Sequence, residues 1–138
     1  MKEQVLSIKQ MQELIALGVD TSKASMIWNP HGFMNKIEYE LKIYDDNIHR
    51  IVDNKLGKLS KELAVFNLVP TFTLHDILEI IKKNVLEKDL SLDLELNLIN
   101  NQFQLTKEVD YSLYTSDGKT LLQSAFQMLK WCKQNNYI

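Results

Sequence analysis

The stretch from residue 120 to 135 constrains the fold most strongly, because it is the clearest amphipathic helix in the chain. Apolar side chains recur there at the spacing of one helical face, while Gln123, Lys130 and Lys133 fall outside that face. A helix of this kind needs an apolar surface to cover. Its apolar stripe consists of Leu121, Leu122, Ala125, Met128, Leu129 and Cys132, widened by Phe126 and Trp131.

Segments with strand patterns upstream provide such a surface. Residues 37–43 and 92–98 alternate apolar with polar side chains, which is typical of half-buried strands. Residues 24–28 are predicted to form a short strand that ends at the following Asn-Pro-His-Gly sequence. Residues 62–69 have strand composition and stop at Pro70.

The alternation on both sides of the Asn-Asn pair at 100–101 predicts a β-hairpin with a two-residue turn. In that register Leu98 lies opposite Phe103, and Leu96 lies opposite Leu105. All four side chains then share one face of the sheet. We expect the C-terminal helix to cover that face.

Three helix starts carry capping-box sequences, in which two side chains satisfy free amides at the first turn. They predict helices over residues 8–17 and 74–83 and at the C-terminal stretch, and Gly18 is expected to stop the first in a left-handed conformation. The predicted pairs are Ser7 with Gln10, Thr73 with Asp76, and Thr120 with Gln123.

These elements predict an α+β fold in which about three helices pack on one face of a mostly antiparallel sheet. At 138 residues the chain is most simply one domain, residues 1–138. The pattern at residues 48–56 favours a further short helix, followed by a loop.

Composition restricts location and partners only broadly. The formal net charge of −2 gives no global reason to bind nucleic acid or an anionic membrane. No stretch approaches the roughly 20 apolar residues of a membrane span, and no signal peptide is recognised. Cys132 is the single cysteine, and its place in the helical stripe predicts a buried side chain. We therefore expect a cytoplasmic protein.

Catalytic and metal-binding motifs are not found, and we predict no cofactor, no metal site and no catalytic residue. The four glycines are isolated, so no phosphate-binding loop is indicated, and no metal-ligand spacing occurs. Trp28 and His31 are the candidate ligand-binding residues, because a ring and an imidazole in one loop can line a pocket. The alternative is that Trp28 packs in the core. His49 and His75 are expected on the surface.

A local excess of positive charge suggests a further site. Such a run is usually a solvated face, but it leaves nucleic-acid binding open. The candidate residues are Arg50, Lys55, Lys58 and Lys61.

Three segments together resemble a group of small proteins from phage-like and mobile genetic elements of gut bacteria. They are residues 11–28, with the sequence Leu-Gly-x-Asp-Thr-Ser-x-Ala-Ser-Met-x-Trp, residues 70–78, with Pro-x-x-Thr-Leu-x-Asp-Ile-Leu, and residues 125–138. The resemblance covers about a third of the chain. It implies an accessory role and supplies no catalytic residue.

Three functional hypotheses follow. The first is a non-enzymatic accessory or interaction protein of a mobile element, which binds another protein or a second copy of itself as a homodimer. The second is a small enzyme or ligand-binding module with a pocket near Trp28 and His31. The third is a weak nucleic-acid binder that uses residues 49–61.

Overall fold

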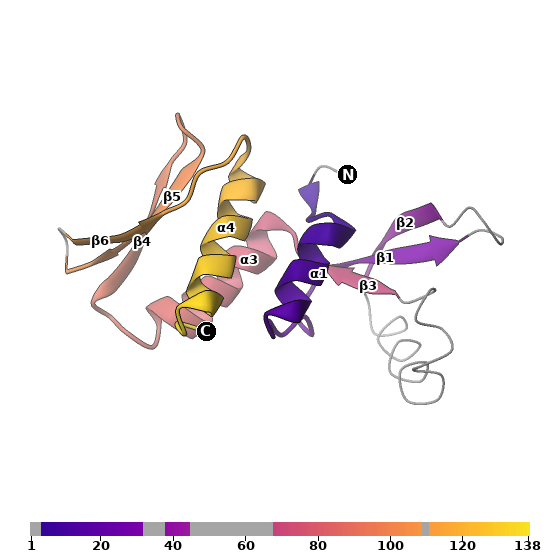
Figure 1. Ribbon diagram of the computed structural model, residues 1–138, viewed down its shortest axis with the longest axis horizontal. Coiled ribbons are helices and arrows are strands. Elements are labelled where there is room, and N and C mark those ends of the chain that lie inside the picture. Colours follow the sequence, from indigo (N-terminus) through magenta and orange to yellow (C-terminus); the bar gives the residue numbers. More distant parts are fainter. Residues whose placement is uncertain (1–3, 32–37, 45–67, 109–110) are drawn as a thin grey trace.

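The computed structural model describes residues 4–31, 38–44, 68–108 and 111–138. Within these ranges the chain forms three α-helices, one π-helical segment and six strands (Figure 1). In chain order they are α1 (Ile8–Ala16), β1 (Met26–His31), β2 (Glu38–Ile43), β3 (Val69–Thr71), α3 (Leu74–Ile81), η3 (Lys82–Leu86), β4 (Leu92–Asn97), β5 (Gln102–Lys107), β6 (Tyr111–Thr115) and α4 (Leu121–Gln134).

The fold is mixed α+β with antiparallel sheets, as predicted. The strands form two three-stranded sheets rather than one, in the orders β2-β1-β3 and β4-β5-β6. Figure 1 shows the helices in the middle of the molecule, with one sheet at each end. An ion pair between Lys130 of α4 and Glu13 of α1, at 3.2 Å, joins the helices across this middle layer.

Two capping boxes are confirmed. The Ser7 hydroxyl accepts the Gln10 amide at 3.2 Å, and the Gln10 side chain accepts the Ser7 amide at 2.9 Å, so α1 starts as predicted. Thr73 and Asp76 form the same pair of bonds at the start of α3. The first helix ends at Ala16, and Gly18 follows its C-cap residue with a left-handed φ of 88°, as predicted.

The third capping box is half formed. The Thr120 hydroxyl accepts the Gln123 amide at 3.2 Å, as predicted. The Gln123 side chain instead accepts the amide of Lys119 at 2.9 Å, one residue further upstream. The last helix therefore has an N-cap residue, and the reciprocal bond secures the loop before it.

The predicted helix over residues 74–83 is longer than expected and changes type. The α-helix ends at Ile81 and continues as the π-helical segment η3, so the helical path runs to Leu86. In this segment the Glu87 amide donates to the Lys82 carbonyl at 2.9 Å, which is the wider π-type spacing. Val85 is buried there.

The first sheet is centred on β1, which pairs with β2 along its whole length and with β3 at Met26–Trp28. The strand runs from Met26 to His31, so it begins two residues later and ends three residues later than the predicted range of 24–28. Pro30 lies within it and pairs with Tyr39 of β2, at a position where β3 no longer runs alongside. A proline is tolerated there because its missing N–H faces no third strand.

The second sheet contains the predicted hairpin in a different register. Phe103 of β5 lies opposite Leu96, and Leu105 lies opposite Leu94. The predicted pairing of Leu98 with Phe103 is wrong by two residues, because residues 98–101 form a longer turn than the expected Asn-Asn turn. A shift of two residues keeps each side chain on its predicted face.

The face of the second sheet that meets α4 is buried only in part. Phe103 and Leu105 are buried, as predicted. Leu96 is 47% exposed and Leu98 is 68% exposed, so the expectation that the last helix covers them is wrong. The part of the sheet nearest the turn extends beyond the covered area.

The C-terminal helix α4 packs against α3, β5 and β6. Trp131 of α4 stacks on Tyr114 of β6, with ring centroids 5.0 Å apart, and on Tyr137 at 5.4 Å. This aromatic stack fixes β6 and the chain end to the helix. The buried residues of α4 are Ser124, Ala125, Phe126, Met128, Leu129 and Cys132.

Candidate functional site

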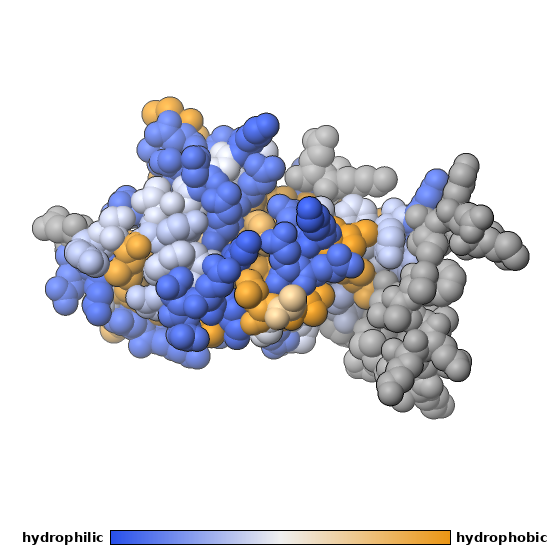
Figure 2. Space-filling model, in the orientation of Figure 1, coloured by the Kyte–Doolittle hydropathy of each residue, from blue (hydrophilic) through white to orange (hydrophobic). Residues whose placement is uncertain are grey.

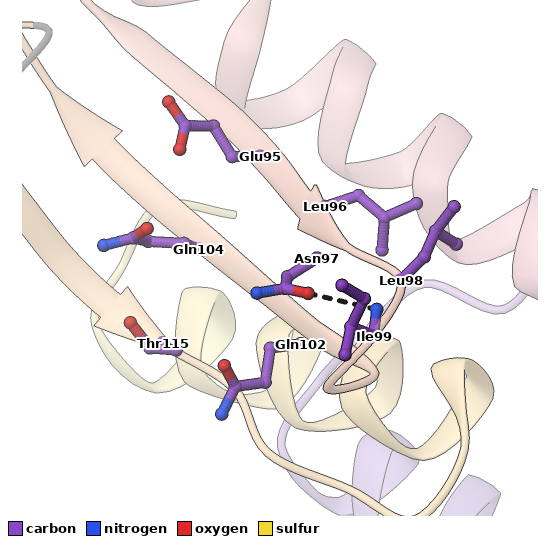
Figure 3. Close-up of a pocket in the computed structure, with 8 residues that line it drawn as sticks. All are labelled: Glu95, Leu96, Asn97, Leu98, Ile99, Gln102, Gln104 and Thr115. Carbon is purple, nitrogen blue, oxygen red and sulfur yellow. Dashed lines mark hydrogen bonds between the residues drawn. The ribbon is translucent and has the colours of Figure 1, made fainter.

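The β4–β5 turn is built by the side chain of Asn97. Its Oδ1 accepts the amide of Ile99 at 3.1 Å (Figure 3). It also accepts the amide of Asn100 at 3.3 Å. These two bonds give the amides of the turn a hydrogen-bond acceptor. They stabilise one conformation of residues 98–101. The turn thus has its own internal hydrogen bonds.

Asn101 fixes the same turn to the start of α4. Its φ of 52° is left-handed, a conformation that asparagine tolerates better than most residues. The Asn101 side-chain amide donates to the Lys119 carbonyl at 3.1 Å, and the Ser124 hydroxyl donates to the Asn101 carbonyl. A Cβ at Gly118 would lie 2.9 Å from the Ser124 amide nitrogen. The loop before α4 therefore needs glycine at this position in order to pass so close to the helix.

Three large apolar side chains lie exposed on this turn and on the end of β4 that leads into it. Leu96 is 47% exposed, Leu98 is 68% exposed and Ile99 is 92% exposed. We call Leu96, Leu98 and Ile99 the hairpin tip. Figure 2 shows hydrophobic surface at the top of the molecule, where Figure 1 places the β4–β5 turn.

A hollow of about 490 Å³ lies beside the hairpin tip (Figure 3). Glu95, Gln104 and Thr115 occupy equivalent positions on β4, β5 and β6, so they form a polar row across the sheet. Asn97 and Gln102 form a second polar pair nearer the turn. The hollow is lined by Glu95, Leu96, Asn97, Leu98, Ile99, Gln102, Gln104 and Thr115.

The chemistry of this hollow suits recognition. Among the described residues that line it, Glu95 is the single titratable group, and no cysteine, histidine or serine accompanies it as a nucleophile or base. Amide and hydroxyl groups offer hydrogen bonds, and the tip offers apolar contact.

A second hollow, of about 460 Å³, lies where the loop before β1 meets α3. It includes the buried carboxylate of Asp76, which accepts the Ser25 amide at 3.0 Å, the Ser25 hydroxyl at 2.5 Å and the Thr73 amide at 3.0 Å. These bonds cap α3 and attach the loop to it, so Asp76 has a structural role. His75 also lines the hollow and is exposed, as predicted.

Asp20 lies at the rim of this second hollow. Hydrogen bonds from the backbone and side chain of Ser22 hold the pKa of Asp20 below its ordinary value. The carboxylate therefore stays ionised and supports the turn that leads into β1.

The structure places Trp28 in the core, in agreement with the second of the two sequence interpretations. Its side chain is buried, and its Nε1 donates to the Leu6 carbonyl at 3.0 Å. His31 ends β1 opposite Glu38, and its side chain lies outside the described part of the structure. A ligand-binding role for His31 stays a prediction.

The basic candidates Arg50, Lys55, Lys58 and Lys61 lie outside the described residues, as do the helix expected at residues 48–56 and most of the strand expected at 62–69. The nucleic-acid hypothesis for this region therefore stays a prediction.

Cys132 is a core residue, as predicted. Its side chain is fully buried in α4, and burial raises the pKa of the thiol to about 12. The thiolate is the reactive form of cysteine, so this thiol is inert near neutral pH.

Sequence reasoning missed the hairpin tip because it assigned Leu98 to the buried ladder. The available signal was the pair of apolar residues Leu98 and Ile99 directly before two asparagines. Turn residues are usually polar, so two adjacent aliphatic side chains at a turn indicate exposed apolar surface.

Comparisons of the chain with protein-family models, with curated proteins and with solved structures find no match. In the described ranges, no group of three or more histidine, cysteine, aspartate or glutamate side chains could hold a metal ion. The helices of the described residues include none that is both long and apolar enough to cross a bilayer.

Proposed function

We propose that this protein is a non-enzymatic interaction protein that binds another protein through the hairpin tip. The observation that carries the proposal is the exposure of Leu98 and Ile99, at 68% and 92%, on a turn whose backbone is hydrogen-bonded to α4. Adjacent exposed apolar residues on an ordered support are typical of a contact surface.

Two energetic terms favour binding at the hairpin tip. Full burial of an aliphatic side chain contributes roughly 1.5–3 kcal/mol, so Leu98 and Ile99 together offer a partner a substantial contact. The bonds from Asn97, Asn101 and Ser124 already order the turn, so binding loses less conformational entropy than it would with a free loop. The hairpin tip is therefore preorganised for contact.

The hollows support a non-enzymatic role. The hollow beside the hairpin tip offers one carboxylate, and the second hollow engages the buried carboxylate of Asp76 in helix capping. The thiol of Cys132 is buried in the core. The Ser25 hydroxyl donates to the Asp76 carboxylate, and both groups serve to attach the loop before β1 to α3.

The proposal also includes the protein's biological role and its location in the cell. The accessory role in a phage-like or mobile element is supported by the three sequence segments that resemble such proteins. The cytoplasmic location is supported by the single, unpaired cysteine.

Site-specific photo-crosslinking tests the proposal. A photoreactive amino acid replaces Ile99 in one variant. In the control it replaces Gln12, an exposed residue of α1. Both variants are expressed in cells of the organism that naturally makes the protein. We expect a discrete protein adduct from position 99 and none from position 12. Leu98→Ser should weaken that adduct because it removes half of the apolar pair. An adduct of two copies of this chain would identify the partner as a second copy.

The proposal is contradicted if position 99 gives no discrete adduct, or if both positions give the same adducts. Equal yields with and without Leu98→Ser would also exclude an apolar contact at the hairpin tip. The side chains of Leu98, Ile99 and Gln12 are all exposed, so the variants at these positions are expected to fold normally.

A further inference from the structure

The strand β4 forms a regular free edge of the second sheet. It pairs with β5 over six consecutive residue pairs and has no second neighbour among the described strands. The opposite edge, β6, is interrupted by a bulge near Leu105 and Thr106. Bulges blunt an edge, whereas a regular edge can pair with a further strand.

The hydrogen bonds of β5 show which β4 groups face outward. The Phe103 amide donates to the Ser116 hydroxyl at 3.1 Å, and its carbonyl accepts the Ser116 amide at 2.8 Å, so Phe103 faces the β6 side. Backbone groups alternate along a strand, so Gln104 faces β4, and Glu95 opposite it faces β5.

Leu94 and Leu96 therefore direct their backbone groups away from the sheet. The Leu94 amide donates to its neighbour Asp93 at 3.0 Å, a local bond that occupies it while no partner is present. For the Leu96 amide, no side-chain acceptor is found in the described ranges. The edge thus offers hydrogen bonds next to the hairpin tip.

The polar face of β4 is acidic. Asp93 and Glu95 are exposed, and neither forms an ion pair with a described lysine or arginine. The one cation on β5, Lys107, lies opposite Leu92 and so belongs to the other face. The polar partners across the sheet, such as Gln104 and Thr106, are neutral.

Two hollows lie along β4, and Glu95 lines both of them. One is the hollow beside the hairpin tip, and the other, of about 380 Å³, is lined by Leu90, Asp93 and Thr106 among others. Together they extend along the strand from one end to the other. Side chains of an added strand would have space beside both carboxylates.

From these observations we propose that β4 binds an extended segment of a partner protein in which lysine or arginine alternates with apolar residues. The proposal rests on the function proposed above and names the chemistry of its partner. The segment adds a strand to β4 through the outward groups of Leu94 and Leu96. Its basic side chains meet Asp93 and Glu95, and its apolar side chains lie beside Leu96 and the turn.

A second copy of this chain fits the edge poorly. Antiparallel pairing of β4 with itself would place the Asp93 and Glu95 carboxylates of both copies on one face at close spacing. Like charges on neighbouring strands destabilise the pairing. The acidic edge therefore selects a basic partner.

The probe for the test is a capped peptide in which lysine and valine alternate over the length of β4, added to the 138-residue chain. We expect binding by fluorescence anisotropy, with NMR shifts and slowed hydrogen exchange at the Leu94 and Leu96 amides. Asp93→Asn combined with Glu95→Gln should weaken binding by about tenfold at low salt. A matched peptide of glutamate and valine should not bind.

A backbone control separates strand pairing from charge attraction. The same basic peptide, N-methylated at every second residue, keeps its charge but loses the amides that would face β4. We expect at least a tenfold loss of affinity, on the order of a few lost hydrogen bonds. Equal binding of the two peptides, or unchanged Leu94 and Leu96 amides, would overturn the proposal.

The two proposals fail separately. If crosslinking at Ile99 captures a partner but the basic peptide leaves the β4 amides unchanged, only the strand addition is wrong. If the peptide binds β4 and position 99 gives no adduct in cells, the function of the hairpin tip is wrong while the edge still accepts a strand.

Discussion

The strands β1 and β4 differ in how their sequences relate to their burial. In β1 three consecutive residues, Met26, Ile27 and Trp28, are buried, although this stretch shows no alternation. In β4 the alternation is nearly perfect, yet of its three leucines only Leu92 is buried. Leu94 is partly buried, and Leu96 is exposed. The strand with the cleaner pattern is the less buried one.

The difference shows that alternation and coverage are separate properties. Alternation specifies which side chains share a face, and this was predicted correctly for β4 and β5. Coverage depends on where the helix α4 begins and ends along the sheet, which the strand sequence does not contain. The uncovered end of β4 is the part that carries the exposed apolar residues.

The largest predicted effect concerns the buried strand. Trp28→Ala should destabilise the protein by about 3–5 kcal/mol, because it leaves a cavity and removes the donor to the Leu6 carbonyl. Leu96→Ala, on the exposed end of β4, should cost less than about 1 kcal/mol. Urea unfolding measures both. Similar losses in the two variants would remove the distinction between the strands.

The loop before β1 is expected to depend on a buried carboxylate. Asp76→Ala should cost about 1.5–3 kcal/mol, because it leaves the Ser25 and Thr73 amides without their acceptor. Glu79→Ala, in the same helix, is the control and should cost about 0.5 kcal/mol, since its ion pair with Lys83 is partly exposed. Thermal unfolding gives both values, and equal shifts would assign no special role to Asp76.

The anchor of the β4–β5 turn should have a smaller effect on stability. Ser124→Ala removes the hydroxyl that donates to the Asn101 carbonyl and should cost about 0.5–1.5 kcal/mol. Hydrogen exchange at the Ile99 and Asn100 amides should accelerate because the turn loosens. Ser112→Ala, at an exposed position of β6, should change neither quantity.

The smallest effect is expected at the hairpin tip itself. Leu98→Ser combined with Ile99→Ser should change the unfolding free energy by less than about 0.5 kcal/mol, because both side chains are already in solvent. Partner binding should be lost in the same variant. A clear loss of stability would show that these side chains pack in the folded protein, and the comparison between β1 and β4 would fail.

Local signals in the sequence predicted the helix starts well. The bonds of Ser7 with Gln10, and of Thr73 with Asp76, form between residues three apart, so the sequence contains both partners. The same holds for Gly18, whose left-handed conformation is a property of that residue. The buried position of Cys132 follows from helical spacing.

The hairpin register could not be predicted in the same way. An Asn-Asn turn and a four-residue turn both preserve the alternation, so periodicity does not distinguish them. The side chain of Asn97 decides between them by accepting two amides of the turn. The candidate site was missed for the same reason, since the shorter turn would have placed Leu98 inside the ladder.

Two hydrogen bonds attach the turn to the start of α4, one from the Asn101 side chain to the Lys119 carbonyl and one from the Ser124 hydroxyl to the Asn101 carbonyl. The same helix closes the core through Met128 and Leu129. A molecule that binds the turn also contacts a segment attached to this helix, and its binding should raise the melting temperature of the protein. Thermal shift is thus a direct screen for partners, with no need for a functional assay.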